Sequence, residues 1–362
     1  MIVVKGVRSV AGVLTLALLL AACNGSPAGP PAELVEGVDL AVLFAPPTAR
    51  EVQDVLDEWS RRRPEARDVT VALTRPFPIG STPATLRILS HTVDGSRHFG
   101  AIITPDGDGP LPVLVILHGG DDGVNLSSAD LGAVLLALGE EGGDFVFVVP
   151  SFRAEALSVD GTAFLSEGEP SPWDRDVDDA IALLDAALAT TPRADPQRVG
   201  ALGFSRGGLV ALLMAIRDDR VDQVLEFFGP TDFFDTFARQ VVTEALQGRP
   251  RGLPGIAILD QRFIQPLKQG ALSEEQVRPE LVKRSAVLFA DRIPTLQLHH
   301  GTADDVVDVS QARSLIRAME RLGRGPPDFE GFLYEGGGHD PLTFPTSIPR
   351  ARAFVARLGA AR

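Results

Sequence analysis

The sequence predicts an α/β protein built around a mostly parallel sheet, on two observations. First, six short apolar segments have the length and composition of buried strands: residues 113–117, 145–149, 199–202, 224–228, 295–298 and 331–334. Second, apolar residues recur at helical spacing between them, around residues 177–188 and 312–322. Strands that are apolar on both faces and alternate with helices are typical of a parallel sheet covered by helices on both sides. Ligands bind such sheets beyond the carboxyl ends of the strands, so catalytic side chains are expected there.

Two further elements are predicted ahead of this sheet. Helical spacing of apolar residues predicts an outer helix over residues 51–62. Residues 86–91 and 98–104 are predicted as two strands of a hairpin that turns at Asp94-Gly95.

Composition and charge limit the class of protein. The 362 residues are 44% apolar and 23% charged, which is the balance of a globular chain with a large core. The formal net charge is −14 and no block of Lys or Arg occurs, so nucleic acid is not an expected partner.

The N-terminus is typical of a bacterial lipoprotein signal. Two basic residues precede a short apolar run over residues 10–20, and small residues follow it. A transmembrane anchor is the weaker alternative, because a spanning helix needs about 20 apolar residues. Cys23 is the only cysteine in the chain, and Leu-Ala-Ala-Cys23 resembles the lipobox in which such a cysteine is lipidated. We therefore expect a signal peptide over residues 1–22, a membrane contact through a lipid on Cys23, and a location in the bacterial cell envelope, at the periplasmic face or the cell surface.

Ser205 is the first candidate catalytic residue. It lies in Gly203-Phe-Ser-Arg-Gly207, after the strand predicted at 199–202 and before an apolar helix at 209–216. A serine between glycines at a strand-to-helix turn is typical of a nucleophile elbow, in which the backbone doubles back in a strained conformation. A glycine-rich turn that only caps a buried helix is the alternative, so the partners of the serine decide between the two.

An oxyanion site is predicted from two segments. His118-Gly119-Gly120 follows the strand at 113–117, where backbone N–H groups would face a developing negative charge. The residue after the nucleophile, Arg206, would supply the second N–H. We expect Gly120 and Arg206 to be the donors, although Gly119 and Asp121 stay open as alternatives for the first position.

The remaining partners follow two later strands. An acidic pair, Asp304 and Asp305, lies just beyond the strand at 295–298, and His339 lies just beyond the strand at 331–334. Ser205, Asp304 and His339 thus occur in the chain order Ser, Asp, His, the order of the triad that accompanies a G-x-S-x-G elbow. Three triad residue types at three strand ends favour the nucleophile over the simple turn.

These motifs resemble those of the α/β-hydrolase superfamily, and within it the catalytic domain of prolyl-oligopeptidase-like (S9-type) hydrolases. The resemblance covers about residues 80–362. It rests on LHGG (117–120), DPQRVGALGFSRGG (195–208), HHGTADDVV (299–307) and YEGGGH (334–339). In that family the first aspartate of the H-G-x-x-D segment is catalytic, which points to Asp304 rather than Asp305. The resemblance implies the α/β-hydrolase fold with a helical insertion, and it implies no cofactor.

The chain divides into four expected parts. They are the signal peptide, a segment with the lipidated cysteine and a Gly/Pro-rich linker (23–33), an N-terminal helical or extended segment (34–79) and the hydrolase domain (80–362). A cap over the active site is expected within residues 230–290 of the last part.

The cap is expected to make the substrate pocket apolar. Phe233, Phe234 and Phe237 would line it, together with the loop after Pro150 and the turn at 119–124. A helical excursion packed away from the site is the alternative.

The expected function is therefore a serine hydrolase that cleaves an ester or small amide through an acyl-enzyme. The part before residue 80 is too short for the β-propeller of larger S9-type peptidases, which favours a carboxylesterase over a peptidase that acts on short peptides. A non-catalytic surface binding protein on a hydrolase fold is a further alternative. No histidine pair lies at metal-ligand spacing with a third partner, so no catalytic metal is expected. His91, His98 and His299 are expected to be structural or surface residues, and His300 to stabilise the loop that carries Asp304.

Overall fold

The computed structural model describes residues 33–127, 134 and 143–360, which belong to one compact unit. The predicted signal peptide, Cys23 and most of the linker lie outside these residues. Across the described part of the chain, no helix has the length and apolarity that a membrane crossing requires.

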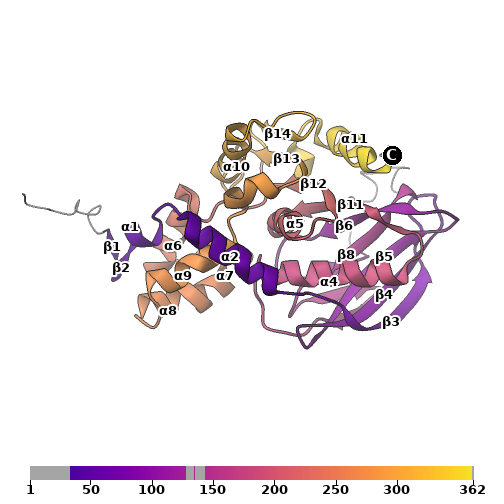
Figure 1. Cartoon of the computed structure of the whole chain (residues 1–362), viewed down its shortest axis with the longest axis horizontal. Helices are drawn as coiled ribbons and strands as arrows, with labels where there is room; N and C mark the ends of the chain where they lie inside the picture. The colour runs from indigo at the N-terminus through magenta and orange to yellow at the C-terminus, as the bar shows by residue number, and fades with distance from the viewer. Residues whose placement is uncertain (1–32, 128–133, 135–142, 361–362) are drawn as a thin grey trace, which may run out of the picture. The chain divides into compact units, whose positions relative to one another are not determined.

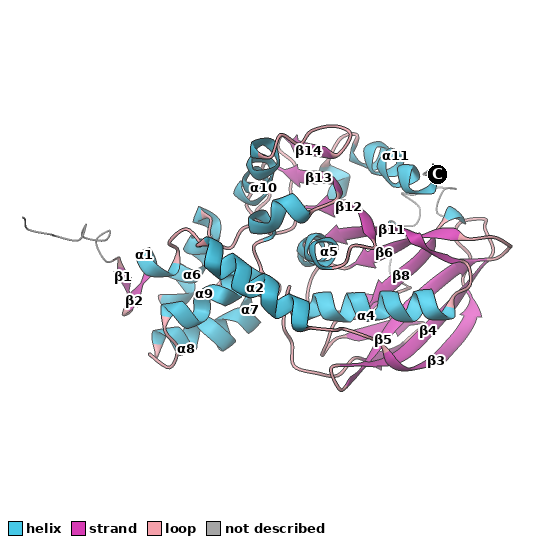
Figure 2. Ribbon diagram, viewed as in Figure 1, coloured by secondary structure: helices cyan, strands magenta, loops and turns pink. Residues whose placement is uncertain are grey.

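A nine-stranded sheet organises the described residues, in the order β14-β13-β12-β11-β6-β8-β5-β4-β3 (Figures 1 and 2). The strands from β14 to β8 run parallel, and β5, β4 and β3 continue the sheet in antiparallel order. The mostly parallel sheet is therefore confirmed. In chain order the strands are β3 (Arg67–Pro76), β4 (Ala84–Val93), β5 (Ser96–Pro105), β6 (Leu111–Leu117), β8 (Val146–Pro150), β11 (Ala194–Phe204), β12 (Val221–Phe227), β13 (Thr295–Gly301) and β14 (Phe329–Tyr334).

Helices cover both faces of this sheet, as predicted. The helices α4 (Arg175–Thr190), α5 (Arg206–Arg217) and α10 (Ser310–Arg321) pack into one core cluster, and α11 (Ser347–Ala360) packs into the other. The strand β6 shows why the sheet has a core cluster on each face: successive side chains of a strand point to opposite faces. Its odd-numbered residues 113–117 enter the first cluster, and Leu114 and Ile116 enter the second.

The N-terminal segment is built into the same unit. It contains β1 (Leu34–Val35), β2 (Val38–Asp39), α1 (Leu40–Leu43) and α2 (Ala49–Arg61), which is the predicted outer helix. The strand β3 then pairs with β4, so the boundary expected at residue 80 divides one continuous sheet. Most residues of β3 are exposed at the sheet edge, and this strand therefore lacks the apolar pattern that would have predicted it.

The hairpin predicted ahead of the sheet is formed by β4 and β5. Asp94 and Gly95 make its turn with φ of 51° and 79°. Both angles lie in the left-handed region that two-residue hairpin turns require, and Asp-Gly supplies it at low steric cost. A small separate sheet of β7 (Val124–Asn125), β9 (Ala156–Val159) and β10 (Thr162–Leu165) was not predicted, because its strands are only two to four residues long.

The insertion after β12 is helical, as expected, and we call residues 229–293 the cap. It contains α6 (Thr236–Leu246), α7 (Ile256–Leu259), a π-helical turn (Asp260–Ile264), α8 (Gln265–Lys268), α9 (Glu274–Lys283) and a 3₁₀ segment (Ala286–Arg292) (Figure 2). The cap also contacts the N-terminal segment, since Arg278 Nε of α9 donates to Glu51 Oε1 of α2 at 2.6 Å. A short 3₁₀ turn (Pro341–Thr343) connects the last strand to α11.

Candidate active site

Ser205 lies at the sharp turn between β11 and α5. Its backbone has φ 52° and ψ −119°, a conformation that residues with a side chain rarely adopt. The turn is held by two backbone hydrogen bonds: Ser205 N–H donates to Phe227 O of β12, and Gly208 N–H donates to Ser205 O, each at 2.9 Å. The serine is therefore presented by a strained turn that the neighbouring strand and helix hold in place.

The glycines around Ser205 have a steric reason. A Cβ atom at Gly203 would overlap the backbone of Gly207, because the chain doubles back on itself. A Cβ atom at Gly207 would overlap the carbonyl of Leu117 at the end of β6. The G-x-S-x-G spacing is thus required by the close approach of the elbow to its own chain and to the neighbouring strand.

Asp304 and His339 lie together in the loops after β13 and β14. Asp304 Oδ2 accepts a hydrogen bond from His339 Nδ1 at 2.8 Å, and Oδ1 accepts from the N–H groups of Val306 and Val307 at 2.9 Å each. Burial raises the pKa of Asp304, but the hydrogen bonds from His339 and Val307 outweigh it and bring this pKa below its usual value. Asp305 is exposed, so Asp304 is the acid that contacts the imidazole.

The loops that carry Ser205 and His339 lie at the same edge of the sheet. They follow β11 and β14, with β12 and β13 between them. Phe228, directly after β12, has φ 44°, and its ring centroid is 4.3 Å from that of His339 and 6.2 Å from that of Phe204. Because Nδ1 of His339 is engaged by Asp304, Nε2 is the ring nitrogen left for a proton transfer.

The other histidines have structural roles, as expected. His300 Nε2 contacts Val307 O at 2.8 Å, which ties the Asp304 loop to β13. His299 contacts the Tyr334 hydroxyl at 2.7 Å and stacks on neighbouring aromatic rings. His91 and His98 are buried in the β4–β5 hairpin. Burial lowers the pKa of each of these four imidazoles.

The predicted oxyanion turn lies against the elbow. A Cβ atom built on Gly119 would be 3.1 Å from the Cβ atom of Ser205, so this turn and the serine are direct neighbours. Gly120 has φ 73°, and its carbonyl accepts from Arg206 Nη1 at 3.2 Å. The turn is therefore hydrogen-bonded to Arg206, the residue that follows Ser205. Burial lowers the pKa of the adjacent His118 to about 4.

The side chain of Arg206 was not anticipated as a structural hub. It is buried and forms a two-pronged ion pair with Asp176 at the start of α4, at 2.8 Å and 2.9 Å. Its Nη1 also donates to Asp121 Oδ1 at 2.8 Å and to Glu155 Oε1 at 2.5 Å. Burial raises the pKa of Glu155 to about 7 against the opposing effect of Arg206. These carboxylates lie 30 to 85 residues away in sequence, so only the fold could reveal the cluster.

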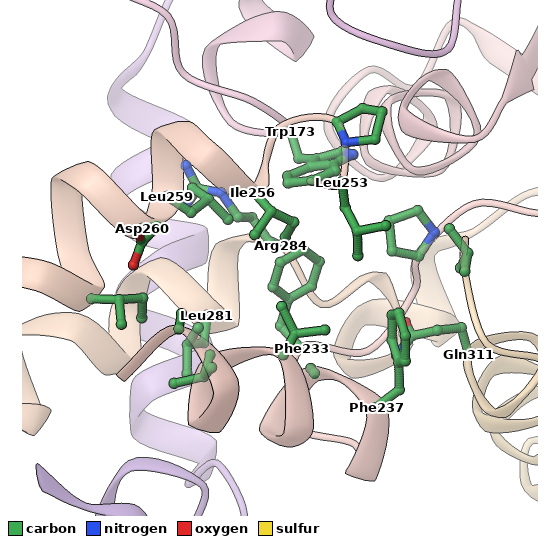
Figure 3. A pocket seen from close by; sticks show the side chains of 18 of the residues that line it. Trp173, Phe233, Phe237, Leu253, Ile256, Leu259, Asp260, Leu281, Arg284 and Gln311 are labelled. Carbon is green, nitrogen blue, oxygen red and sulfur yellow. The ribbon is translucent and has the colours of Figure 1, made fainter. Parts of the chain in front are cut away.

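The cap encloses an apolar pocket (Figure 3). Ser205 and Arg206 are among the residues that line it. Phe233 and Phe237 line it, as expected, and Trp173 lies with them around the same cavity. Phe234 is not among the lining residues; it packs under the Arg278 guanidinium instead. The segment after Pro150 contributes Trp173, just before α4, whereas no residue of the turn at 119–124 is among the lining residues.

The polar lining residues of the pocket include Asp232, Glu280, Arg284 and Gln311. Glu280 pairs with Arg284, whose Nη1 lies 2.8 Å from Glu280 Oε2. Asp232 and the further lining residue Asp260 accept hydrogen bonds, Asp232 from Phe234 N–H and Ser314 Oγ and Asp260 from Gln265 Nε2. No group of three His, Cys, Asp or Glu side chains that could hold a metal ion occurs within residues 33–127, 134 and 143–360.

Fold and site together define the class of the protein: it is a hydrolase with the α/β-hydrolase fold. Residues 100–263 match the model of the dienelactone hydrolase family. Comparison with curated protein sequences gave no match.

Solved structures with the same fold include esterases and peptidases. Acetyl xylan esterase 1 from Thermoanaerobacterium is 18% identical, with a TM-score of 0.59 over 89% of this chain and 99% of that chain. An acetyl xylan esterase from Paenibacillus is 18% identical, with a TM-score of 0.56 over 88% and 98%. A puromycin-hydrolyzing peptidase from Mycobacterium tuberculosis is 18% identical, with a TM-score of 0.51 over 81% of this chain and 46% of the peptidase. The motifs resemble S9-type hydrolases, whereas the family model that matches is that of the dienelactone hydrolases. The solved structures support the fold that both predict.

Proposed function

We propose that the protein is a serine carboxylesterase in which Ser205, His339 and Asp304 form the catalytic triad. The observation that carries this proposal is the combination of a strained Ser205 in the wall of an apolar pocket with an Asp304–His339 pair at the same sheet edge.

In the proposed reaction, Ser205 Oγ attacks the ester carbonyl carbon while His339 Nε2 takes the hydroxyl proton. Asp304 stays ionised, holds the imidazole by Nδ1 and stabilises the imidazolium that forms. The negative charge on the carbonyl oxygen is stabilised by the N–H groups of Gly120 and Arg206. The C–O bond then breaks, the alcohol leaves with the proton from His339, and an acyl-enzyme remains. Water, activated by the same histidine, releases the acid and restores the serine.

The pocket supports an apolar acyl group as the substrate part beside Ser205. Phe233, Phe237 and Trp173 offer large apolar surface, and Glu280 in the same lining is paired with Arg284. A free peptide amine would need a carboxylate to itself there, since burying an unpaired charge is costly. The other two lining carboxylates already accept hydrogen bonds, Asp232 from Phe234 N–H and Ser314 Oγ and Asp260 from Gln265 Nε2. Glu274 and Glu275 do not serve this role, because neither lines the pocket.

The test compares two substrate classes on the same preparation. We expect a higher kcat/KM for p-nitrophenyl butyrate than for a prolyl or alanyl dipeptide p-nitroanilide. The opposite ranking would identify a peptidase that uses the same serine. Hydrolysis of neither class, together with binding of small molecules to the pocket, would favour the non-catalytic binding protein.

We also propose that the enzyme acts in the bacterial cell envelope, held by a lipid on Cys23. The signal pattern over residues 1–22 and the single cysteine support this proposal. Several acyl chains on one residue would anchor a chain stably, since each buried CH₂ contributes about 0.8 kcal/mol.

A further inference from the structure

One contact between the cap and the catalytic loops is centred on Gly255, the residue before α7. Its N–H donates to Asp121 Oδ2 at 2.7 Å. The other oxygen of the same carboxylate, Oδ1, accepts from Arg206 Nη1 at 2.8 Å. Asp121 therefore joins three parts of the site: the cap, the oxyanion turn in which it lies, and the residue after Ser205.

A second path connects the cap to Arg206 without Asp121. Trp173 packs so closely on Gly255 that a Cβ atom there would overlap the indole ring. The backbone N–H of Trp173 donates to Asp176 Oδ2 at 2.9 Å, and the same oxygen accepts from Arg206 Nε at 2.8 Å. Together the two paths form a closed chain of contacts, which we call the contact ring. It runs from Arg206 through Asp121, Gly255, Trp173 and Asp176 back to Arg206, and Gly255 is its only residue from the cap.

Gly255 is suited to this position by its backbone. Its φ of 76° lies in the left-handed region, and this conformation leaves its N–H directed at Asp121. Trp173 also has a positive φ, 63°, and its ring lies 5.4 Å from that of Phe233 in the pocket wall. An acyl group in the pocket would therefore touch Trp173, whose side chain belongs to the contact ring.

We propose that Asp121 is a positioning residue that couples occupancy of the cap pocket to the geometry of the oxyanion turn. This inference rests on the serine esterase function proposed above. The carboxylate fixes Arg206 and the turn relative to the cap, so binding energy from the acyl chain is available to hold the oxyanion donors in place. Interactions of remote substrate parts raise kcat when they are used at the reacting centre in this way.

The coupling predicts how kcat depends on acyl length. In the wild type, kcat should rise from p-nitrophenyl acetate to p-nitrophenyl hexanoate, because only the longer chain fills the pocket. Asp121→Ala should reduce the ratio of kcat for the hexanoate to kcat for the acetate by about tenfold, which is the effect of losing a hydrogen bond to a charged group. Asp121→Asn keeps an oxygen for the Gly255 N–H but loses the charge for Arg206, so an intermediate gain is expected.

Asp122→Ala is the matched control: Asp122 is the next residue of the same turn and is exposed, as Asp121 is, but within the described residues it makes no hydrogen bond or ion pair. It should keep the wild-type dependence on acyl length. The melting temperature of each variant shows whether it is folded. An equal loss of kcat for both esters in Asp121→Ala would overturn the coupling, and so would a wild-type kcat that does not rise with acyl length.

A second experiment does not depend on ester hydrolysis. Gly255→Ala disturbs the contact ring from the cap side, because the added methyl group would overlap the indole of Trp173. It should accelerate backbone hydrogen exchange in residues 118–123, relative to the wild type and to Asp122→Ala. Unchanged exchange in that segment would contradict the coupling even if the wild type hydrolysed no ester. Failure of the esterase proposal would appear instead as a wild type without ester hydrolysis, or as activity that persists in Ser205→Ala.

Discussion

At the scale of single residues, the close approach of backbones explains the motif around Ser205. The elbow requires glycine at 203 and 207, because the chain there touches itself and the end of β6. The acid is also specified locally: the Asp304 side chain accepts from two backbone N–H groups of its own loop, which orients Oδ2 towards His339. The neighbouring carboxylate, Asp305, is exposed, and the imidazole of His339 contacts Asp304 instead.

This geometry predicts different effects for the two neighbouring aspartates. Asp304→Asn should lower kcat by about 10⁴-fold, the loss typical of an orienting aspartate in serine proteases, because the imidazole would lose its negatively charged partner. Asp305→Asn should change kcat far less. Steady-state hydrolysis of p-nitrophenyl butyrate by both purified variants checks this prediction. The reverse ranking would assign the acid to Asp305.

The three residues of the proposed triad stand out in the sequence because each lies in a short motif at a strand end. Arg206 shows the limit of this reasoning. Its backbone position followed from the motif, whereas its side-chain partners come from the oxyanion turn, the loop after β8 and the start of α4. Ion pairs between distant segments leave no periodic pattern in the sequence, so the pairing of Arg206 with Asp121, Glu155 and Asp176 was not predicted.

At the scale of elements, the packing of α5 on β12 buries a carboxyl group that the proposed reaction does not use. Glu226 of β12 is fully buried beneath the first turn of α5. Its Oε1 accepts from Gly229 N–H, and within the described part of the chain Oε2 has no hydrogen-bond partner. Burial raises the pKa of Glu226 to about 8 from its usual value of 4.5. The group is therefore neutral in the folded protein at neutral pH and ionised in the unfolded chain.

This difference sets the sign of a pH effect on stability. A raised folded-state pKa gives a contribution that is complete below about pH 4.5 and is lost as the pH rises through about 8. The free energy of unfolding should fall by up to about 1.4 kcal/mol per pH unit within that window for this one group. Glu226→Gln keeps an acceptor for Gly229 N–H and should remove this part of the slope. Urea unfolding of both proteins at several pH values measures it, and identical slopes would contradict the assignment.

The elements themselves were mostly predictable, with instructive exceptions. Strands buried on both faces and the helices between them follow from apolar runs and helical spacing. The edge strand β3 could not be predicted from an apolar run, because it pairs with a neighbouring strand on one side only and most of its residues are exposed. The helical cap was expected, but which of its phenylalanines face the pocket depends on the turns between short helices. Phe234 consequently packs on α9 although its neighbours Phe233 and Phe237 line the cavity.

At the scale of the whole molecule, the location of the enzyme depends on residues outside the described structure. Cys23→Ser should abolish lipid attachment and leave a soluble or unprocessed protein. The wild type should partition into the detergent phase after extraction of cells, whereas the variant should not. A wild type that stays wholly in the soluble periplasmic or culture fraction would contradict the anchor. The catalytic constants of the two proteins should agree, because the triad is far from Cys23 in sequence.

The central claim is that Ser205 is the nucleophile, and covalent labelling tests it most directly. A fluorophosphonate reacts with an activated serine and adds its phosphonyl group to the protein. Intact mass measurement should show one such group on the wild type and none on Ser205→Ala, which should also lose hydrolysis of p-nitrophenyl butyrate. Labelling or ester hydrolysis that persists in a folded Ser205→Ala variant would contradict the account.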